Sequence, residues 1–259
     1  MKTVIICGGK GERLREETEF KPKPLVEIGG KPILYHIMKG YIQHGYNDFI
    51  LALGYKGYLI KEYFLHMSAM ASNFTIKLGP KTDIRYYDQE KMEDWTVTFV
   101  ETGLETLSGG RVARVKEFIG KDEDFFYTYG DGLSNVDIRG LYDFHKRTGK
   151  IVTITGINPP SPFGILDVEG DIAKSFKEKP TLDGITNGGF WVCNRKVFDY
   201  ITTDEKCQFE DDPLKNIAAE GQLAVYHHRG YWDCMDTYKQ VSRLNKLWET
   251  GQAPWKVWK

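Results

Sequence analysis

Short runs of apolar, often β-branched residues recur along this chain and end at glycine or at polar residues. They lie at residues 3–7, 49–53, 96–100, 125–128 and 152–155. Runs of this length are typical of buried strands in a parallel sheet. Between the first two runs, apolar residues recur at helical spacing from Ile33 to Ile42, after Pro32 and before Gly45, which predicts a helix. Residues 58–64 and 237–248 predict two further helices.

The alternation of strand and helix predicts an α/β fold with a doubly wound, mostly parallel (Rossmann-like) sheet. Residues 164–168 and 172–176 predict further strands, which would form an additional sheet region facing the substrate. Residues 66–95 interrupt the alternation and are interpreted as an insertion with short strands, one of them at 84–87. That insertion is either a surface excursion or a contact in an oligomer.

The first strand ends in a glycine-rich loop. Strand end and loop comprise Ile6, Cys7, Gly8, Gly9, Lys10, Gly11 and Glu12, followed by Arg13 and, further on, by Lys23. Three glycines in four residues let consecutive backbone N–H groups approach phosphate oxygens closely. Arg13 and Lys23 add fixed positive charge beside a polyanion. Because ligands of such sheets bind outside the carboxyl ends of the strands, we predict a phosphate-binding site here.

Two well-known phosphate motifs do not fit this loop. The dinucleotide fingerprint needs a third glycine where the chain has Leu14. A P-loop needs a glycine five residues before its Gly-Lys pair and a Ser or Thr after it. The pair Gly9-Lys10 has Val4 and Gly11 at these places. The loop therefore belongs to neither class.

The loop fits the signature G-G-x-G-x-R-L followed by K-P, and further segments match in the same order. They are residues 21–34 (KPKPLVEIGGKPIL), 108–111 (SGGR), 128–132 (TYGDG), 178–180 (EKP), 187–190 (NGGF), 235–237 (MDT) and 253–256 (APWK). With these segments, nearly the whole chain resembles the sugar-phosphate nucleotidyltransferase family. The Lys-Pro doublet, the SGGR segment and the C-terminal tail resemble the cytidylyltransferase branch of that family more narrowly.

The resemblance implies a single nucleotidyltransferase domain, 1–259, in three parts. Residues 1–150 would bind the nucleotide and carry the insertion near 66–95; residues 151–236 would bind the sugar phosphate; residues 237–259 would form a C-terminal helix and tail. It implies catalytic roles for Arg13 and Lys23. Besides the glycine-rich loop, the implied nucleotide contacts are Thr106, Gly110, Arg111 and Gly130, and the implied sugar-phosphate contacts are Glu178, Lys179, Asn187 and Gly188. Taken alone, the SGGR segment is more typical of a turn and helix cap.

Two aspartates stand out in the matching segments. Asp131 lies between glycines at the end of a strand, and Asp236 precedes a helix that begins at Thr237. Each alone would suit a turn or a helix cap. The resemblance implies that both hold Mg²⁺, which prefers one or two carboxylates together with phosphate oxygens.

The implied reaction transfers a cytidylyl group from CTP to α-D-glucose 1-phosphate, giving CDP-glucose and pyrophosphate. The attacking phosphate is ionised at neutral pH, since its second pKa is about 6, so no general base is needed. Two alternatives stay open: another nucleoside triphosphate or phosphorylated acceptor, and a catalytically silent sugar-nucleotide-binding subunit. One residue departs from the family pattern, because Glu12 stands where most relatives carry Thr.

Composition limits the partners and the compartment. With 35 basic and 36 acidic residues the net charge is -1, which argues against nucleic acid or a membrane surface as a partner. The four cysteines form no CxxC pair, which indicates reduced thiols. The apolar run before Gly8 is too short for a signal peptide, and no run reaches the roughly 18 residues of a membrane span. We expect a cytoplasmic enzyme, and the resemblance implies a homo-oligomer, with a hexamer as the suggested form.

Overall fold

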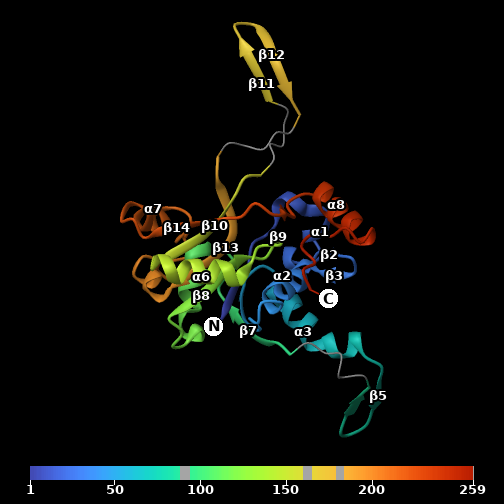
Figure 1. Ribbon diagram of the computed structural model, residues 1–259. Helices are drawn as coiled ribbons and strands as arrows, with labels where there is room; N and C mark the ends of the chain where they lie inside the picture. Colours follow the sequence, from blue (N-terminus) through green and yellow to red (C-terminus); the bar gives the residue numbers. More distant parts are fainter. Residues whose placement is uncertain (88–93, 160–164, 179–183, 259) are drawn as a thin grey trace.

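A central sheet of seven strands organises the chain (Figure 1). The computed structural model describes residues 1–87, 94–159, 165–178 and 184–258. The sheet has the order β14-β10-β13-β8-β1-β4-β7. Its strands are β1 (Thr3–Cys7), β4 (Asp48–Leu53), β7 (Thr96–Glu101), β8 (Asp124–Tyr129), β10 (Val152–Ile157), β13 (Thr186–Asn194) and β14 (Leu223–His227).

The sheet is mostly parallel, as the sequence predicts. Strand β1 pairs in parallel with β4 and β8, β4 pairs in parallel with β7, and β10 pairs in parallel with β14. Only β13, among these seven strands, runs antiparallel to its neighbours β8 and β10. The start of β13 therefore lies at the same edge of the sheet as the carboxyl ends of β1 and β8.

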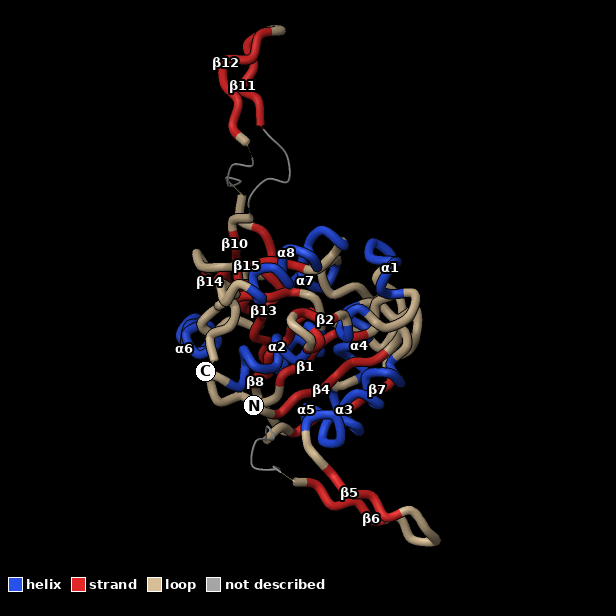
Figure 2. Tube along the Cα trace, turned by 90° about the vertical axis from the view of Figure 1, so that its right-hand side faces the viewer, coloured by secondary structure: helices blue, strands red, loops and turns tan. Residues whose placement is uncertain are grey.

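Helices cover both faces of the sheet (Figure 2). Side chains of a strand alternate between the two faces, and those of β1 and β4 divide accordingly. Ile5 and Leu51 belong to one buried apolar cluster, and Val4 and Ile50 belong to another. The helices are α1 (Arg15–Thr18), α2 (Ile33–Ile42), α3 (Gly57–Ala71), α4 (Ser108–Arg114), α5 (Lys116–Ile119), α6 (Ile138–Thr148), α7 (Asp212–Ala219) and α8 (Tyr238–Glu249). This is the predicted doubly wound arrangement.

Helix α3 extends well beyond the predicted range of 58–64. Its buried residues are Gly57 and Ile60, near its beginning, whereas Leu65 and Met70 in its second half are exposed. The later turns have no apolar face packed on the core, so helical periodicity cannot reveal them.

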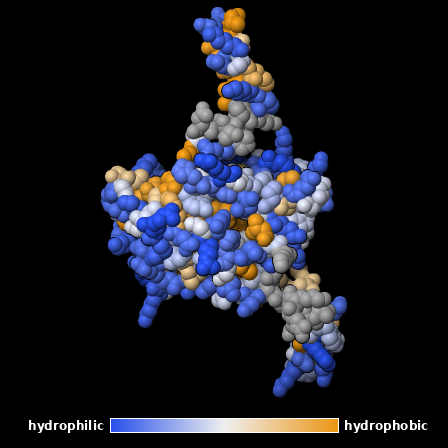
Figure 3. Space-filling model, viewed as in Figure 1, coloured by the Kyte–Doolittle hydropathy of each residue, from blue (hydrophilic) through white to orange (hydrophobic). Residues whose placement is uncertain are grey.

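Two hairpins project from the body in different directions (Figures 1 and 2). One pairs β5 (Phe74–Lys77) with β6 (Asp83–Tyr86), which is the strand predicted at 84–87. The other pairs β11 (Ile165–Glu169) with β12 (Ile172–Lys177); residue 164 of the predicted strand lies outside the described residues. Figure 3 shows apolar side chains on the surface of the second hairpin. Within the described part of the chain, β11 and β12 pair only with each other and not with the central sheet.

A short antiparallel pair connects two distant segments at the edge of the body. Strand β9 (Gly132–Ser134) pairs with β15 (Trp232–Cys234), with Gly132 opposite Cys234. The shorter strands β2 (Glu27–Ile28) and β3 (Lys31–Pro32) form a second such pair. None of the helices in the described ranges has the length and apolar character needed to cross a membrane.

Candidate active site

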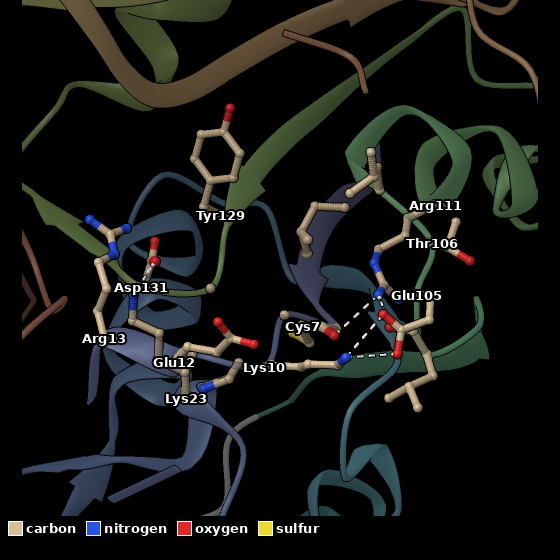
Figure 4. A pocket seen from close by; sticks show the side chains of 18 residues that line it. Cys7, Lys10, Glu12, Arg13, Lys23, Glu105, Thr106, Arg111, Tyr129 and Asp131 are labelled. Carbon is tan, nitrogen blue, oxygen red and sulfur yellow. Dashed lines mark hydrogen bonds and ion pairs between the residues drawn. The ribbon is translucent and has the colours of Figure 1, made fainter. Parts of the chain in front are cut away.

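The candidate site lies at the edge of the sheet where β1 and β8 end. A cavity of about 550 Å³ opens there, within the roughly 300–1,000 Å³ that is usual for small-molecule sites. The predicted residues that line it are Ile6, Cys7, Gly8, Gly9, Lys10, Gly11, Glu12, Arg13, Lys23, Thr106, Arg111, Gly130 and Asp131. Residues from five separate segments of the sequence therefore meet in one cavity (Figure 4).

The glycine-rich loop forms one wall of the cavity. Gly11 has a φ of 65°, in the left-handed region where glycine is favoured. Among the hydrogen bonds of the described residues, the backbone N–H groups of Gly9, Lys10 and Gly11 donate to no protein acceptor. Such free N–H groups beside basic side chains form a suitable cradle for phosphate oxygens.

Arg111 holds this loop in place from behind. Its side chain is buried, and its Nη2 donates to the carbonyl of Gly8 at 3.1 Å. Its Nη1 donates to Leu53 O at 2.9 Å and to Thr102 Oγ1 at 2.7 Å. A Cβ at Gly8 would overlap the guanidinium, so glycine is required there. Arg111 thus ties the ends of β1, β4 and β7 together beneath the cavity.

The opposite wall carries Thr106 and Glu105. Thr106 is buried, and its Oγ1 accepts a hydrogen bond from Arg114 Nη1 at 2.8 Å, which leaves its hydroxyl proton available. Lys10 reaches across from the loop to Glu105 and approaches it within 2.7 Å (Figure 4). Both partners are largely exposed, so this ion pair joins the two walls with little energy.

A cluster of opposite charges occupies one end of the cavity. Lys23 Nζ lies 2.7 Å from Asp131 Oδ2 and 2.6 Å from Asp236 Oδ1. Arg13 Nη2 approaches the same oxygen of Asp236 within 3.0 Å. The pairing of β9 with β15 explains this meeting, because the N–H of Met235 also donates to the carbonyl of Asp131 at 2.9 Å.

The cluster perturbs the pKa values of Lys23 and Asp236. Burial acts to lower the pKa of Lys23, but the charge of Asp131 and the hydrogen bonds to both aspartates outweigh it and raise that pKa. Burial acts to raise the pKa of Asp236, but Lys23 and Arg13 hold it below the ordinary value. At neutral pH Lys23 and Asp236 are therefore ionised.

A second cavity of about 220 Å³ adjoins the first. The two share Arg13, Tyr129 and Asp131 as lining residues. The second also contains the predicted residues Asn187, Gly188 and Asp236. Asn187 lies just inside the start of β13 and reaches this edge because that strand is antiparallel. Its Oδ1 accepts hydrogen bonds from Gly189 N at 2.8 Å and from Trp191 Nε1 at 2.7 Å.

Two predicted residues, Gly110 and Glu178, do not line these cavities, and a third lies outside the described residues. Gly110 is buried in α4 behind Thr106, where a Cβ would overlap the carbonyl of Asp204. Glu178 follows β12 on the projecting hairpin and is exposed. Lys179 lies outside the described residues.

Sequence reasoning also missed residues that the structure places in the site. Tyr129 lines both cavities, and Trp232 and Cys234 line the second. Tyr129 stood inside the matching TYGDG segment, which was a usable signal. Trp232 and Cys234 reach the site through β15, a strand of three residues, which is too short for an alternation of apolar and polar side chains to be recognised in the sequence. Cys7 is buried, which raises the pKa of its thiol and makes it a packing residue rather than a nucleophile.

The two aspartates fit a divalent cation. Both accept a hydrogen bond from the ammonium group of Lys23, so the two accepting oxygens cannot be farther apart than the sum of these two hydrogen-bond lengths. Lys23 is in effect a stand-in cation between them. In the described ranges no group of three or more His, Cys, Asp or Glu side chains could hold a metal ion. A site of two carboxylates, completed by phosphate oxygens, suits Mg²⁺ but not a cation that requires an all-protein cage.

Known proteins resemble this chain over nearly its whole length. A family model described as "Nucleotidyl transferase" matches residues 2–249. The chain is 51% identical over 258 residues to a Bacillus subtilis (strain 168) protein named "Probable glucose-1-phosphate cytidylyltransferase", and both chains are fully covered. It is 47% identical over 260 residues to the glucose-1-phosphate cytidylyltransferase of Salmonella typhi, again with full coverage of both.

A solved structure extends the similarity to the fold. The UDP-glucose pyrophosphorylase of Acinetobacter baumannii superimposes with a TM-score of 0.70, covering 97% of this chain and 95% of that one. At 17% identity, this match concerns the fold alone. The match of the family model and the two full-length relatives decide the assignment: the chain belongs to the nucleotidyl transferase family.

Proposed function

We propose that this chain is a glucose-1-phosphate cytidylyltransferase, which transfers a cytidylyl group from CTP to α-D-glucose 1-phosphate and releases pyrophosphate. The observation that carries the proposal is that two cavities meet at one cluster of opposite charges, formed by Lys23, Asp131, Asp236 and Arg13. The larger cavity has room for a nucleoside triphosphate, and the smaller one has room for a hexose. The names of the two full-length relatives support the choice of CTP and glucose 1-phosphate.

The chemistry requires positioning more than proton transfer. An oxygen of the sugar phosphate forms a bond to the α-phosphorus while the bond from that phosphorus to the bridging oxygen of pyrophosphate breaks. The attacking oxygen is already ionised, so no proton has to be removed. Rate enhancement must then come from alignment of two anions and from stabilisation of the charge that builds on the transferred group.

We assign the phosphate contacts to the loop and its two basic residues. The free N–H groups from Gly9 to Gly11 hold the β- and γ-phosphates, and Arg13 neutralises them as they leave. Lys23 faces the α-phosphate, where charge develops. Lys179 is assigned to bind the phosphate of the sugar.

Asp131 and Asp236 are the proposed Mg²⁺ ligands. When bound, Mg²⁺ neutralises the α-phosphate and the incoming phosphate, which lowers the repulsion between the two anions. In the free chain the same carboxylates keep Lys23 protonated, since the charge of Asp131 and the hydrogen bonds to both aspartates raise its pKa.

Recognition of the base and the sugar is assigned to the walls of the two cavities. Thr106 can donate its free hydroxyl proton to a ring acceptor of cytosine, and Gly110 allows the helix behind it to pack closely. Arg111 acts indirectly, by fixing the loop. Asn187 and Glu178 are proposed to hydrogen-bond the sugar hydroxyls.

Pyrophosphate release with four nucleoside triphosphates, each tested against a panel of sugar 1-phosphates, is the direct test. The proposal requires that CTP with glucose 1-phosphate has the highest kcat/KM. A different preferred pair would mean that the proposed reaction type is correct and the proposed substrates are wrong. No release with any pair would support a silent binding subunit instead.

We further propose that the chain forms a homo-oligomer and works in the cytoplasm. Both projecting hairpins expose apolar side chains, among them Ile76 and Ile84 on one and Leu166 and Phe176 on the other, and a second copy would cover them. The four cysteines are free thiols, which agrees with a reducing compartment. Light scattering of the purified chain would measure the number of copies, and a monomer would contradict the first statement.

A further inference from the structure

Glu210 is a half-buried carboxylate that accepts hydrogen bonds from three hydroxyl groups. Tyr129 donates to its Oε1 at 2.5 Å, and Tyr127 donates to the same oxygen at 3.2 Å. Ser108 donates to the other oxygen, Oε2. Glu210 is not among the described residues that line either cavity. The residues that donate hydrogen bonds to it nevertheless connect it to both cavities.

One oxygen of Glu210 connects to the wall of the larger cavity. Ser108 is the first residue of α4, and its Oγ also accepts the N–H of Phe209 at 3.0 Å. Nearby, Leu107 N donates to the carbonyl of Glu205 at 2.7 Å. The segment 205–210 therefore holds the start of α4, and the residues beside this start, from Thr106 to Arg111, include lining residues of the larger cavity.

The other oxygen connects to the boundary between the cavities. Tyr129 lines both of them, on the same side as Arg13 and Asp131 and opposite Thr106 (Figure 4). Its phenol oxygen also accepts a hydrogen bond from Asn187 Nδ2 at 3.3 Å. Burial, followed by the charge of Glu210, raises the pKa of Tyr129, so its proton stays on the bond to Glu210 at neutral pH.

We propose that Glu210 is a positioning residue that couples the nucleotide pocket to the sugar-phosphate pocket. Its two oxygens point to different partners, so one side chain fixes the start of α4 and the ring of Tyr129 relative to each other. A nucleotide that binds against α4 therefore also fixes the ring of Tyr129 in the position that receives the sugar phosphate. This inference rests on the proposed function only for the choice of ligands, because the connection between the cavities does not depend on it.

Binding, rather than turnover, tests the coupling. The affinity for glucose 1-phosphate is measured by calorimetry with and without a saturating, non-reactive α,β-methylene analogue of CTP. We expect the analogue to tighten binding of the sugar phosphate at least about fivefold in the wild type, the lower end of ordinary coupling between sites. Glu210→Gln keeps the shape but loses one acceptor, and it should reduce this ratio toward one.

Three further variants separate coupling from support of the fold. Tyr129→Phe should weaken sugar-phosphate binding, and Ser108→Ala should weaken binding of the nucleotide analogue. Tyr127→Phe is the matched control, because it removes a phenol bond to the same oxygen of Glu210 from a buried ring outside the described cavity linings. It should leave the ratio unchanged.

The outcomes are decisive in either direction. A wild-type ratio of one, or a Glu210→Gln variant with the wild-type ratio, would overturn the proposal. So would a Tyr127→Phe variant whose ratio falls toward one, as expected for Glu210→Gln, because Glu210 would then serve only the fold. If CTP and glucose 1-phosphate do not bind, the proposed substrates are wrong, and the same ratio is measured with the pair that the pyrophosphate assay selects.

Discussion

Replacing Lys23 by alanine should leave the two aspartates of the cluster repelling each other, with Arg13 alone to offset their charge. Without Lys23, nothing lies between the oxygens of Asp131 and Asp236 that it bridged. Their separation is at most the sum of the two hydrogen-bond lengths, 2.7 and 2.6 Å. Two charges about 5 Å apart, at an effective dielectric constant of about 20, repel by about 3 kcal/mol. For a chain of this size each kcal/mol corresponds to roughly 2–4 °C, so we expect Tm at pH 7 to fall by roughly 6–12 °C.

The pH dependence should change sign with this substitution. In the wild type the pKa of Asp236 is held low, so its contribution to stability is present above about pH 4 and is lost as the pH falls through the lowered value. In Lys23→Ala, the repulsion between the two carboxylates should raise the pKa of Asp236 above its value in the wild type. Protonation then relieves the repulsion, and the difference in Tm from the wild type should shrink between pH 7 and pH 5.

Thermal unfolding with and without millimolar Mg²⁺ completes this test. Mg²⁺ should recover part of the lost Tm in Lys23→Ala, where the place between the aspartates is open, and should change the wild type much less. Turnover should still fall about 10²-fold, as when one transition-state donor is removed. Lys21→Ala is the matched control, since Lys21 lies in the same KPKP segment, residues 21–24, but pairs with Glu17 at 3.5 Å. Wild-type stability of Lys23→Ala at pH 7, without any response to Mg²⁺, would refute the geometry.

Three further substitutions test the proposed assignments. Gly9→Ala should leave Tm unchanged, because no atom lies within 4 Å of an added Cβ, but should weaken CTP binding about tenfold or more by calorimetry; unchanged affinity would place the triphosphate elsewhere. Asp236→Asn should abolish Mg²⁺-dependent turnover and weaken Mn²⁺ binding measured by electron paramagnetic resonance, and activity retained at ordinary Mg²⁺ would show that other groups hold the ion. Glu12→Thr should tighten CTP binding, with a gain that shrinks in salt as screening increases, and an equal affinity at low salt would show that the carboxylate points away.

The fold could be predicted from the sequence where the signal is local. The apolar runs of β1, β4 and β8 and the helical period of α2 are properties of neighbouring residues, and the parallel sheet follows from their alternation. The pairing of the predicted strands at 164–168 and 172–176 is different, because a short strand does not encode which sheet it joins. These strands pair with each other in a hairpin that leaves the body.

The same distinction applies to the site: its continuous segment could be predicted from the sequence, and the contacts between distant segments could not. The glycine-rich loop is one continuous segment, and its place at a strand end is sufficient to indicate phosphate binding. The meeting of Asp131 and Asp236 depends on the pairing of β9 with β15, and it was expected only because matching segments in relatives share a site. Glu210 had no signal, since its partners Ser108 and Tyr129 lie 102 and 81 residues away.

The balance of charges in the cluster makes a last prediction about the order in which partners can enter. Lys23 and Arg13 neutralise the two aspartates in the free chain, so a divalent cation alone would have to displace an ammonium group that already satisfies both carboxylates. A triphosphate offers Lys23 new oxygens, but the movement leaves two carboxylates unpaired unless a cation takes the vacated place. Nucleotide and cation should therefore bind together, each raising the affinity of the other by the same factor. Mn²⁺ titrations with and without CTP, corrected for the complex that the two form in solution, should show this gain in the wild type and a smaller one in Lys23→Ala, where the cation no longer competes with an ammonium group.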